Sequence, residues 1–217
     1  MPLSNPQTLI IQFTKSPDPE PVKTRLASVL SRDQRRELHC ALTEWVCGQL
    51  QSPFCQHELW VAGNLAHPFI QSIPKRYRLV LCQQRGQDLG ERMAEAVKQG
   101  LQSYGQVIII GSDCPFIDLD YLEKAIQQLH QHDVVVGPAT DGGYVLLGMK
   151  RFNPLLFSDI PWGSAMVLAA TLTAINHSAE TVHLLRPLTD IDRPDDLSAL
   201  ADANLPDTLR QFAKYNA

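Results

Sequence analysis

The stretch Val107-Ile108-Ile109-Ile110-Gly111-Ser112-Asp113-Cys114-Pro115 decides the fold class of this 217-residue chain. Its four β-branched residues predict a buried strand, and its end places the carboxylate of Asp113 among small residues. A second stretch repeats the pattern one helix later, where Val134-Val135-Val136 precedes Gly137-Pro138-Ala139-Thr140-Asp141-Gly142-Gly143-Tyr144. In open α/β sheets, ligands bind just outside the carboxyl ends of strands. The two stretches therefore predict both the fold class and the place of a site.

Strands and helices alternate along the rest of the chain. Apolar runs predict further strands at residues 8–13, 58–62, 78–82, 144–147 and 182–185. Helices are predicted to begin after the caps Ser31, Asp118 and Ser164, and another from Leu89. This alternation is typical of a mostly parallel sheet with helices on both faces. No repeat, linker or low-complexity segment divides the sequence, so we expect a single domain over residues 1–217.

Composition excludes several classes of function. The formal net charge is −4, without the concentrated basic face that nucleic-acid binding requires. No apolar run approaches the roughly 18 residues that span a bilayer. The five cysteines have neither CxxC nor zinc-finger spacing, which predicts reduced thiols. Because the first residues also lack a signal-peptide pattern, we expect a cytoplasmic protein that binds no nucleic acid and has no membrane span.

Cations follow the first predicted strand. Lys15 opens the loop, and Lys23 and Arg25 lie two residues apart where a helix is predicted to start. Free backbone amides and the helix dipole favour an anion at such a position, so these three residues are candidate phosphate ligands. A solvated basic turn is the alternative. The loop is neither a P-loop nor a GxGxxG dinucleotide fingerprint.

Two further strand-end regions offer polar or flat side chains. Gln84 and Gly90 lie between the third predicted strand and its helix, at a rim where the edge of a base could be read. A plain strand-to-helix turn is the competing interpretation for them. Trp162 precedes another predicted helix, and its ring is expected either to cover a flat ligand face or to pack in the core.

An acidic segment follows the last predicted strand. Asp190 and Asp192 point the same way if the segment is extended, and one of them could then share a metal with Asp113. The local alternative is that Asp192 or Asp195 caps the helix that Pro194 starts.

Taken in order, these motifs resemble those of the bacterial selenodomain-associated transferases, within the GT-A nucleotide-diphospho-sugar transferase superfamily. The resemblance covers roughly residues 9–200. It implies a GT-A or Rossmann-like three-layer α/β sandwich with a mostly parallel central sheet. The chain departs from the family pattern at Glu20, where the family has glycine, and at Gly163-Ser164, where Ser-Thr follows the tryptophan. The matching motifs are residues 13–17, 22–26, 88–93, 111–115, 137–144 and 190–197.

The resemblance implies a metal-dependent transferase that binds a nucleotide-sugar or nucleoside triphosphate and a small-molecule acceptor. Mg²⁺ or Mn²⁺ would be held by Asp113, with Asp192 as second ligand and Asp190 in reserve. The implied catalytic residues are Asp113, Lys23, Arg25 and Asp141. The implied nucleotide-binding residues are Lys15, Lys23, Arg25, Gln84, Gly90 and Ser112. The implied acceptor-binding residues are Asp141, Gly142, Gly143, Tyr144 and Trp162.

The sequence leaves the reaction open. Glycosyl transfer and nucleotidyl transfer of the guanylyl or cytidylyl type share these parts and differ in which bond breaks, and superfamily membership favours glycosyl transfer slightly. A non-catalytic nucleotide-binding module is a second class, favoured by Glu20 and opposed by the retention of Asp113, Lys23 and Arg25. Asp190-Ile191-Asp192 could also be the DxD motif of a haloacid-dehalogenase phosphatase. That class is disfavoured because its nucleophilic aspartate follows the first strand, whereas this motif follows the last. No sequence feature indicates the oligomeric state.

Overall fold

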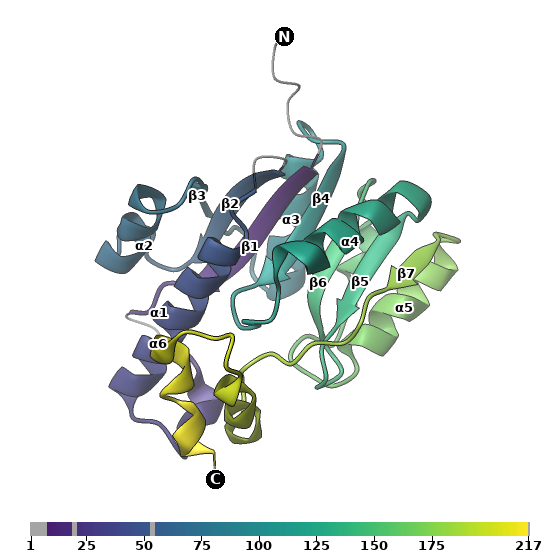
Figure 1. Cartoon of the computed structure of the whole chain (residues 1–217). Coiled ribbons are helices and arrows are strands. Elements are labelled where there is room, and N and C mark those ends of the chain that lie inside the picture. The colour runs from purple at the N-terminus through teal and green to yellow at the C-terminus, as the bar shows by residue number, and fades with distance from the viewer. Residues whose placement is uncertain (1–7, 19–20, 53–54, 217) are drawn as a thin grey trace.

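The computed structural model describes residues 8–18, 21–52 and 55–216, and a seven-stranded sheet forms its middle layer (Figure 1). The order across the sheet is β3-β2-β1-β4-β6-β5-β7, and β6 alone runs antiparallel to its neighbours. The predicted mostly parallel sheet is therefore confirmed. The strands are β1 (Thr8–Lys15), β2 (Cys55–Ala62), β3 (Val80–Gln83), β4 (Gln106–Gly111), β5 (Val134–Pro138), β6 (Tyr144–Met149) and β7 (Val182–Leu184).

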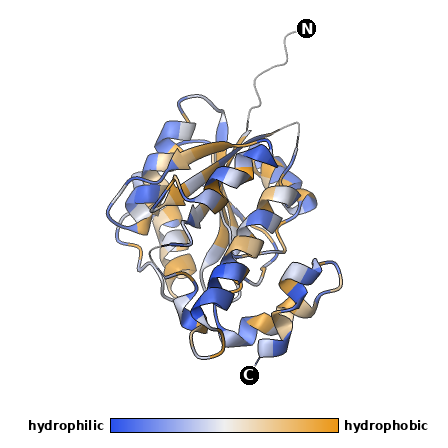
Figure 2. Ribbon diagram, turned by 90° about the vertical axis from the view of Figure 1, so that its left-hand side faces the viewer, coloured by the Kyte–Doolittle hydropathy of each residue, from blue (hydrophilic) through white to orange (hydrophobic). Residues whose placement is uncertain are grey.

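Helices cover both faces of the sheet (Figure 1). On one face α1 (Arg32–Gln49) and α4 (Leu119–Gln131) pack on a core that contains Ile10. On the other face α3 (Leu89–Gly100) and α5 (Val167–His177) pack on a core that contains Leu9 and Ile11. Successive residues of β1 thus serve opposite faces, as the two-residue period of a strand requires. The three-layer arrangement is confirmed, and in Figure 2 the strands are largely orange while the flanking helices carry both colours.

Short helices complete the chain. The α-helical ones are α2 (Pro68–Ser72) and α6 (Asp207–Arg210). The 3₁₀ segments are η1 (Thr24–Leu26), η2 (Ile73–Lys75), η3 (Pro154–Leu156), η4 (Pro194–Ala201) and η5 (Ala213–Tyr215). No helix among the residues described has the length and apolar character needed to cross a membrane.

Two of the three predicted helix caps are confirmed. Ser31 and Gln34 form the reciprocal capping box at the start of α1, and the Asp118 carboxylate accepts from the Tyr121 N–H at 2.8 Å. The prediction for Ser164 is wrong, because α5 begins only at Val167 and has no side-chain cap. The Ser164 hydroxyl instead donates to the carbonyl of Pro161 at 2.8 Å and stabilises the preceding turn.

The last part of the chain returns to the first loop and α1 (Figure 1). Ile191 is fully buried in a cluster that joins η1, α1 and the C-terminal helices. Partners from early in the chain include Leu26, Leu38 and Leu42, and later ones include Leu197 and Phe212. This packing holds the acidic segment against the loop that follows β1.

The strand order reverses between β1 and β4. From β1 the chain first builds β2 and β3 on one side and then crosses to β4 on the other. Such a switch point opens a crevice outside the carboxyl ends of the two strands, where ligands bind in open α/β sheets. Lys15 ends β1 and Asp113 follows β4 by two residues, so both predicted site residues lie at this crevice.

Candidate functional site

Asp113 and Lys23 form an ion pair at the switch point. The Lys23 ammonium nitrogen lies 2.7 Å from Oδ1 of Asp113, and the same ammonium donates to the carbonyl oxygen of Ile191. The Lys23 side chain is 2% exposed, whereas that of Asp113 is 45% exposed. Lys23 also adopts a left-handed backbone conformation with φ of 51°. The predicted phosphate clamp is therefore a buried cation that joins two segments, and its ammonium is already engaged.

The electrostatics of Asp113 favour its charged form. Partial desolvation alone would raise the pKa of its carboxyl, but the charge of the Lys23 ammonium outweighs this effect and holds the pKa below its usual value. Asp113 is consequently ionised at neutral pH while its carboxylate keeps access to solvent. This combination suits a ligand for a hard cation.

The acidic segment is bonded directly to the end of the β4 stretch. The N–H of Ile191 donates to the carbonyl oxygen of Asp113 at 2.8 Å. On one side of Ile191, Asp192 pairs with Arg25 at 2.5 Å, and Arg25 also donates to the Gly163 carbonyl at 3.0 Å. The second predicted phosphate clamp, Arg25, is thus also paired. It links the first loop to the turn that carries Trp162.

On the other side of Ile191, Asp190 lies among carboxylates. Burial, followed by the charge of Asp141 and more weakly that of Asp113, raises the pKa of Asp190 to about 6. Asp190 and Asp192 therefore face different partners. The local capping alternative for Asp192 and Asp195 is wrong, because the Asp196 carboxylate accepts from the N–H groups of Asp192 and Arg193 at the start of η4.

A cavity of about 240 Å³ opens between the start of α3, the turn before β6 and the turn before α5. Asp141 and Asp190 both line it, together with Arg25. Its apolar lining includes Phe13, Leu89, Met93, Tyr144, Trp162 and Val167. The structure brings together most of the residues predicted for an acceptor pocket. Leu89, Met93 and Phe13 were not predicted there, since a strand or helix pattern gives the same signal for a core residue and a cavity wall.

The turn before β6 is fixed by its two glycines. Gly142 has φ of +92°, and a Cβ there would lie 2.3 Å from the carbonyl oxygen of Ala165. Gly143 donates its N–H to Oδ1 of Asp141 at 2.9 Å. Gly142 thus packs against the turn before α5 instead of lining the cavity. This close approach holds the two turns together beside the cavity.

Tyr144 and Trp162 meet edge to face at the apolar side of the cavity. Their ring centroids lie 6.3 Å apart with an interplanar angle of 84°. Gly90 lies against the same turn, since a Cβ on it would approach the Phe157 carbonyl oxygen at 2.4 Å and Nε1 of Trp162 at 2.6 Å. Gly90 therefore contributes close packing at the start of α3, beside the predicted acceptor residues.

Three predicted nucleotide contacts have protein partners. The Ser112 hydroxyl is buried, donates to the Phe13 carbonyl at 2.9 Å and accepts from Gln12 at 2.8 Å, so it is not available to a ligand. The Gln84 amide nitrogen donates to backbone carbonyls at the ends of β1 and β2. The Lys15 carbonyl accepts from His39 at 2.9 Å, while the residue itself is exposed. Glu20 lies outside the described residues.

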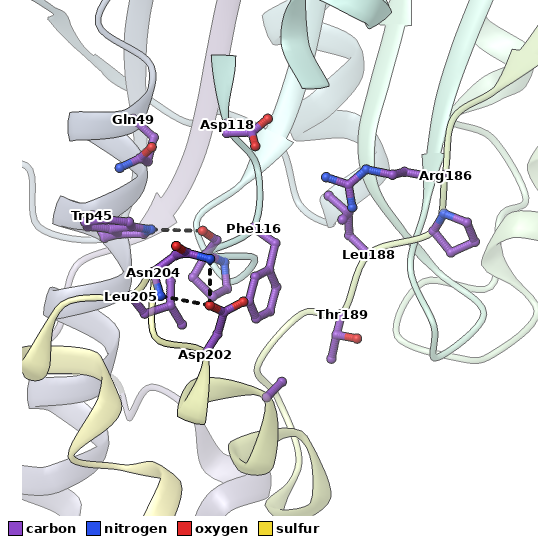
Figure 3. Close-up of a pocket in the computed structure, with 13 residues that line it drawn as sticks. Trp45, Gln49, Phe116, Asp118, Arg186, Leu188, Thr189, Asp202, Asn204 and Leu205 are labelled. Carbon is purple, nitrogen blue, oxygen red and sulfur yellow. Dashed lines mark hydrogen bonds between the residues drawn. The ribbon is translucent and has the colours of Figure 1, made fainter. Parts of the chain in front are cut away.

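A larger cavity, about 700 Å³, lies on the α1 and α4 side of the segment that leads to Asp190 (Figure 3). Its polar groups are partly paired with one another. The Trp45 indole donates to the Pro115 carbonyl at 2.9 Å, and the Asp202 carboxylate accepts from Asn204. None of the predicted site residues lines it. Despite its size, it does not include Asp113, Asp141 or Asp190, and its own carboxylates, Asp118 and Asp202, accept hydrogen bonds from neighbouring protein groups.

The donor set at the switch point is compatible with a divalent metal. Among the residues described, no group of three or more His, Cys, Asp or Glu side chains is arranged to hold a metal ion. Mg²⁺ in nucleotide enzymes is commonly held by one or two carboxylates together with substrate phosphates. Asp113 and Asp190 supply such oxygen ligands, and their charges interact. Asp192 is occupied by Arg25.

Comparison with known proteins agrees with this architecture. A crystal structure from Desulfovibrio desulfuricans G20, provisionally named a nucleotide-diphospho-sugar transferase, superposes with a TM-score of 0.86 at 27% identity, covering 97% of this chain and 98% of its own. A relative from Haloarcula marismortui, named 2-phospho-L-lactate guanylyltransferase, is 28% identical over 194 residues, which are 87% of this chain and 86% of the relative.

A more distant structure shows the shared fold alone. Rv0371c from Mycobacterium tuberculosis H37Rv, in complex with manganese, has a TM-score of 0.50 at 13% identity and covers 96% of this chain and 98% of its own. The expected superfamily resemblance is thus confirmed at the level of the fold. The family described as "Uncharacterized protein conserved in bacteria (DUF2064)" matches residues 46–164, which is more than half of the sequence. The chain belongs to this DUF2064 family.

Proposed function

We propose that the protein is a divalent-metal-dependent nucleotidyltransferase, which transfers a nucleoside monophosphate from a nucleoside triphosphate to a small acceptor. The observation that carries the proposal is the ionised carboxylate of Asp113 at the switch point, oriented by Lys23 and bonded through its backbone to Ile191. An oriented, charged oxygen ligand at this position serves phosphoryl chemistry, in which catalysis rests on positioning and neutralisation of charge.

The guanylyltransferase relative favours nucleotidyl transfer, and GTP is accordingly the first donor to assay. In this reaction an acceptor oxygen attacks the α-phosphorus. The bond from that phosphorus to the bridging oxygen breaks, and pyrophosphate leaves with the electron pair. The proton of the acceptor hydroxyl passes to a carboxylate or to solvent. A bound Mg²⁺ or Mn²⁺ would neutralise charge on the phosphates.

Each residue at the crevice has a role in this scheme. Asp113, with Asp190, would hold the metal. Lys23 is a positioning residue, because its ammonium contacts Asp113 and Ile191 and is 2% exposed. Arg25 positions the acidic segment and the turn at Gly163. Lys15 is exposed beside the crevice and is the candidate for direct contact with phosphate.

The proposal is tested by metal-dependent binding. We expect GTP, or another nucleoside triphosphate, to bind by isothermal titration calorimetry in the presence of Mg²⁺ or Mn²⁺ and to lose at least tenfold in affinity with EDTA. Asp113→Asn should remove this metal dependence. Asp195→Asn is the matched control, since Asp195 is an exposed carboxylate of η4 outside the cavity. Equal metal dependence in both variants would overturn the assignment of Asp113, and metal-independent binding by the wild type would overturn the metal.

Glycosyl transfer is the second candidate, favoured by the provisional name of the Desulfovibrio protein. Slow turnover with water as acceptor separates the two reactions before the natural acceptor is known. A nucleotidyltransferase would release pyrophosphate and a nucleoside monophosphate from the triphosphate. A glycosyltransferase would release free sugar and a nucleoside diphosphate from a nucleotide-sugar. Binding of a donor with release of neither product would support the non-catalytic nucleotide-binding module.

A further inference from the structure

The cavity between α3 and the turn at Trp162 is small and opens to solvent. Its volume of about 240 Å³ corresponds to roughly eight water molecules at the density of the liquid. Gly142 and Gly90 hold its walls close, since a Cβ at either would approach backbone oxygen within 2.4 Å. The cavity therefore suits a small molecule about the size of a single ring with a short substituent.

One side of this cavity is apolar. Leu89 is 41% exposed, whereas Met93, Ala96 and Val97 of the same helix are buried, and Leu89 lines the cavity with Met93. Trp162 lines the same cavity, edge to face with Tyr144. The exposed leucine and the half-buried indole form an uncovered apolar surface. A ligand that removes this surface from water binds more favourably.

The other side of the cavity is acidic and has no free cation. Asp141 and Asp190 are its carboxylates, and their negative charges repel each other. Among the described residues that line it, Arg25 is the only cation. Arg25 donates through one guanidinium nitrogen to Asp192 and through another to the carbonyl of Gly163. Apart from a metal held by Asp113 and Asp190, whose charge the phosphates of the donor would neutralise, a phosphate or carboxylate placed here would face like charge without a partner.

We infer that the acceptor is a small uncharged alcohol with an apolar body, which sits against Leu89 and Trp162 with its hydroxyl toward Asp141. This inference rests on the proposed function, because it names the acceptor of that same site. It separates this chain from the Haloarcula relative, whose printed name implies a phosphorylated acid as acceptor. The hydroxyl end can donate to a carboxylate, whereas an ionised carboxylate or a fully ionised phosphate cannot.

The test uses three probes that share a ring and differ in charge: benzyl alcohol, benzoate and phenyl phosphate. Binding to the full chain is measured by ligand-observed NMR titration, with and without Mg²⁺. We expect benzyl alcohol to bind at least tenfold more tightly than either anion without Mg²⁺, and Mg²⁺ to improve the binding of the anions only. Without Mg²⁺, binding of benzoate or phenyl phosphate as tight as that of benzyl alcohol, or tighter, would overturn the inference.

Variants place the binding at the cavity. Leu89→Ala should weaken benzyl alcohol at least fivefold, whereas Leu184→Ala, a leucine of comparable exposure on the edge strand β7, should leave its affinity unchanged. Asp141→Asn should narrow the preference for the alcohol over phenyl phosphate. Equal effects of the two leucine variants, or an unchanged preference in Asp141→Asn, would overturn the assignment.

The outcome is distinguishable from failure of the proposed function. If the triphosphate binds with metal but the alcohol does not bind, the acceptor inference fails and the nucleotidyltransferase proposal stands. If the alcohol binds as expected and no nucleotide binds, the nucleotidyltransferase proposal fails. The chemistry of the cavity would then stand on the probe series alone.

Discussion

Lys23→Met isolates the contribution of the buried ammonium that joins Asp113 to Ile191. Methionine has a similar length and an apolar side chain, but it neither pairs with a carboxylate nor donates to a carbonyl. We expect the variant to fold, because Lys23 lies outside the apolar clusters that hold the sheet. We expect its free energy of unfolding to fall, since two interactions of one side chain are lost.

The structure sets the size of the effect. Leaving the Ile191 carbonyl unsatisfied in a buried position costs about 1–3 kcal/mol. An ion pair with one side buried and the other 45% exposed lies between the surface range and the buried range, and we take about 1 kcal/mol. The sum is about 3 kcal/mol, which for a chain of this size lowers the melting temperature by about 6–12 °C.

Thermal unfolding followed by circular dichroism measures this change. The pH dependence adds a signature. Because the folded pKa of Asp113 is depressed below its unfolded value, the stabilisation by Lys23 is complete above that unfolded value and is lost as the pH falls below about 4. The difference between wild type and Lys23→Met should therefore shrink toward pH 3.

The control is Lys98→Met, an exposed lysine in the last turn of α3, which should melt like the wild type. A Lys23→Met protein that melts within about 1 °C of the wild type at pH 7 would refute the structural role of the ammonium. Lys23 would then be available as the phosphate clamp that the sequence predicts.

Three further changes follow from the same geometry. Gly90→Ala brings a methyl group against the Phe157 carbonyl at 2.4 Å, so we expect at least tenfold weaker binding of benzyl alcohol in the NMR titration. In the wild type the pKa of Asp190 is raised to about 6, so the free energy of unfolding declines as the pH rises from about 4 to 6. Asp190→Asn removes this carboxyl and the decline with it. This variant should be more stable at pH 7 by up to about 3 kcal/mol in urea unfolding. Burial lowers the pKa of His57 to about 4, so stability is lost as the pH falls from about 6.5 to 4. His57→Leu should reduce the slope of the free energy of unfolding against pH by the equivalent of about one proton. Urea unfolding across this pH range measures the slope.

Most of the fold follows from local patterns in the sequence. The β-branched runs predict the strands, and the Ser31 and Asp118 caps are visible because their partners lie three residues away. The antiparallel direction of β6 is not predicted by these patterns. Ser164 fails as a cap because the turn before α5 is fixed by contacts with Arg25 and Gly142, which are distant in sequence.

The location of the site is predicted from the sequence, but the pairing of its charged side chains is not. The positions of Asp113 and Asp141 follow from strand ends, and the structure brings both to the crevice side of the sheet. What spacing could not indicate is that Lys23 pairs with Asp113 and Arg25 with Asp192, across 90 and 167 residues of chain. Local sequence gives the same signal for a free cation and for one that is paired after folding.

The bond between Asp113 and Ile191 also has a consequence for biosynthesis. The hydrogen bonds of the Lys23 ammonium and of the Asp113 carbonyl to Ile191 cannot form before Ile191 has been made. Ile191 is translated 168 residues after Lys23. Contacts of such separation form late, because the intervening chain must be ordered first. The sheet can begin to assemble while the ribosome is still adding residues, but the crevice stays incomplete until nearly the whole chain has emerged. Nascent chains released early would therefore carry most of the sheet and none of the proposed activity.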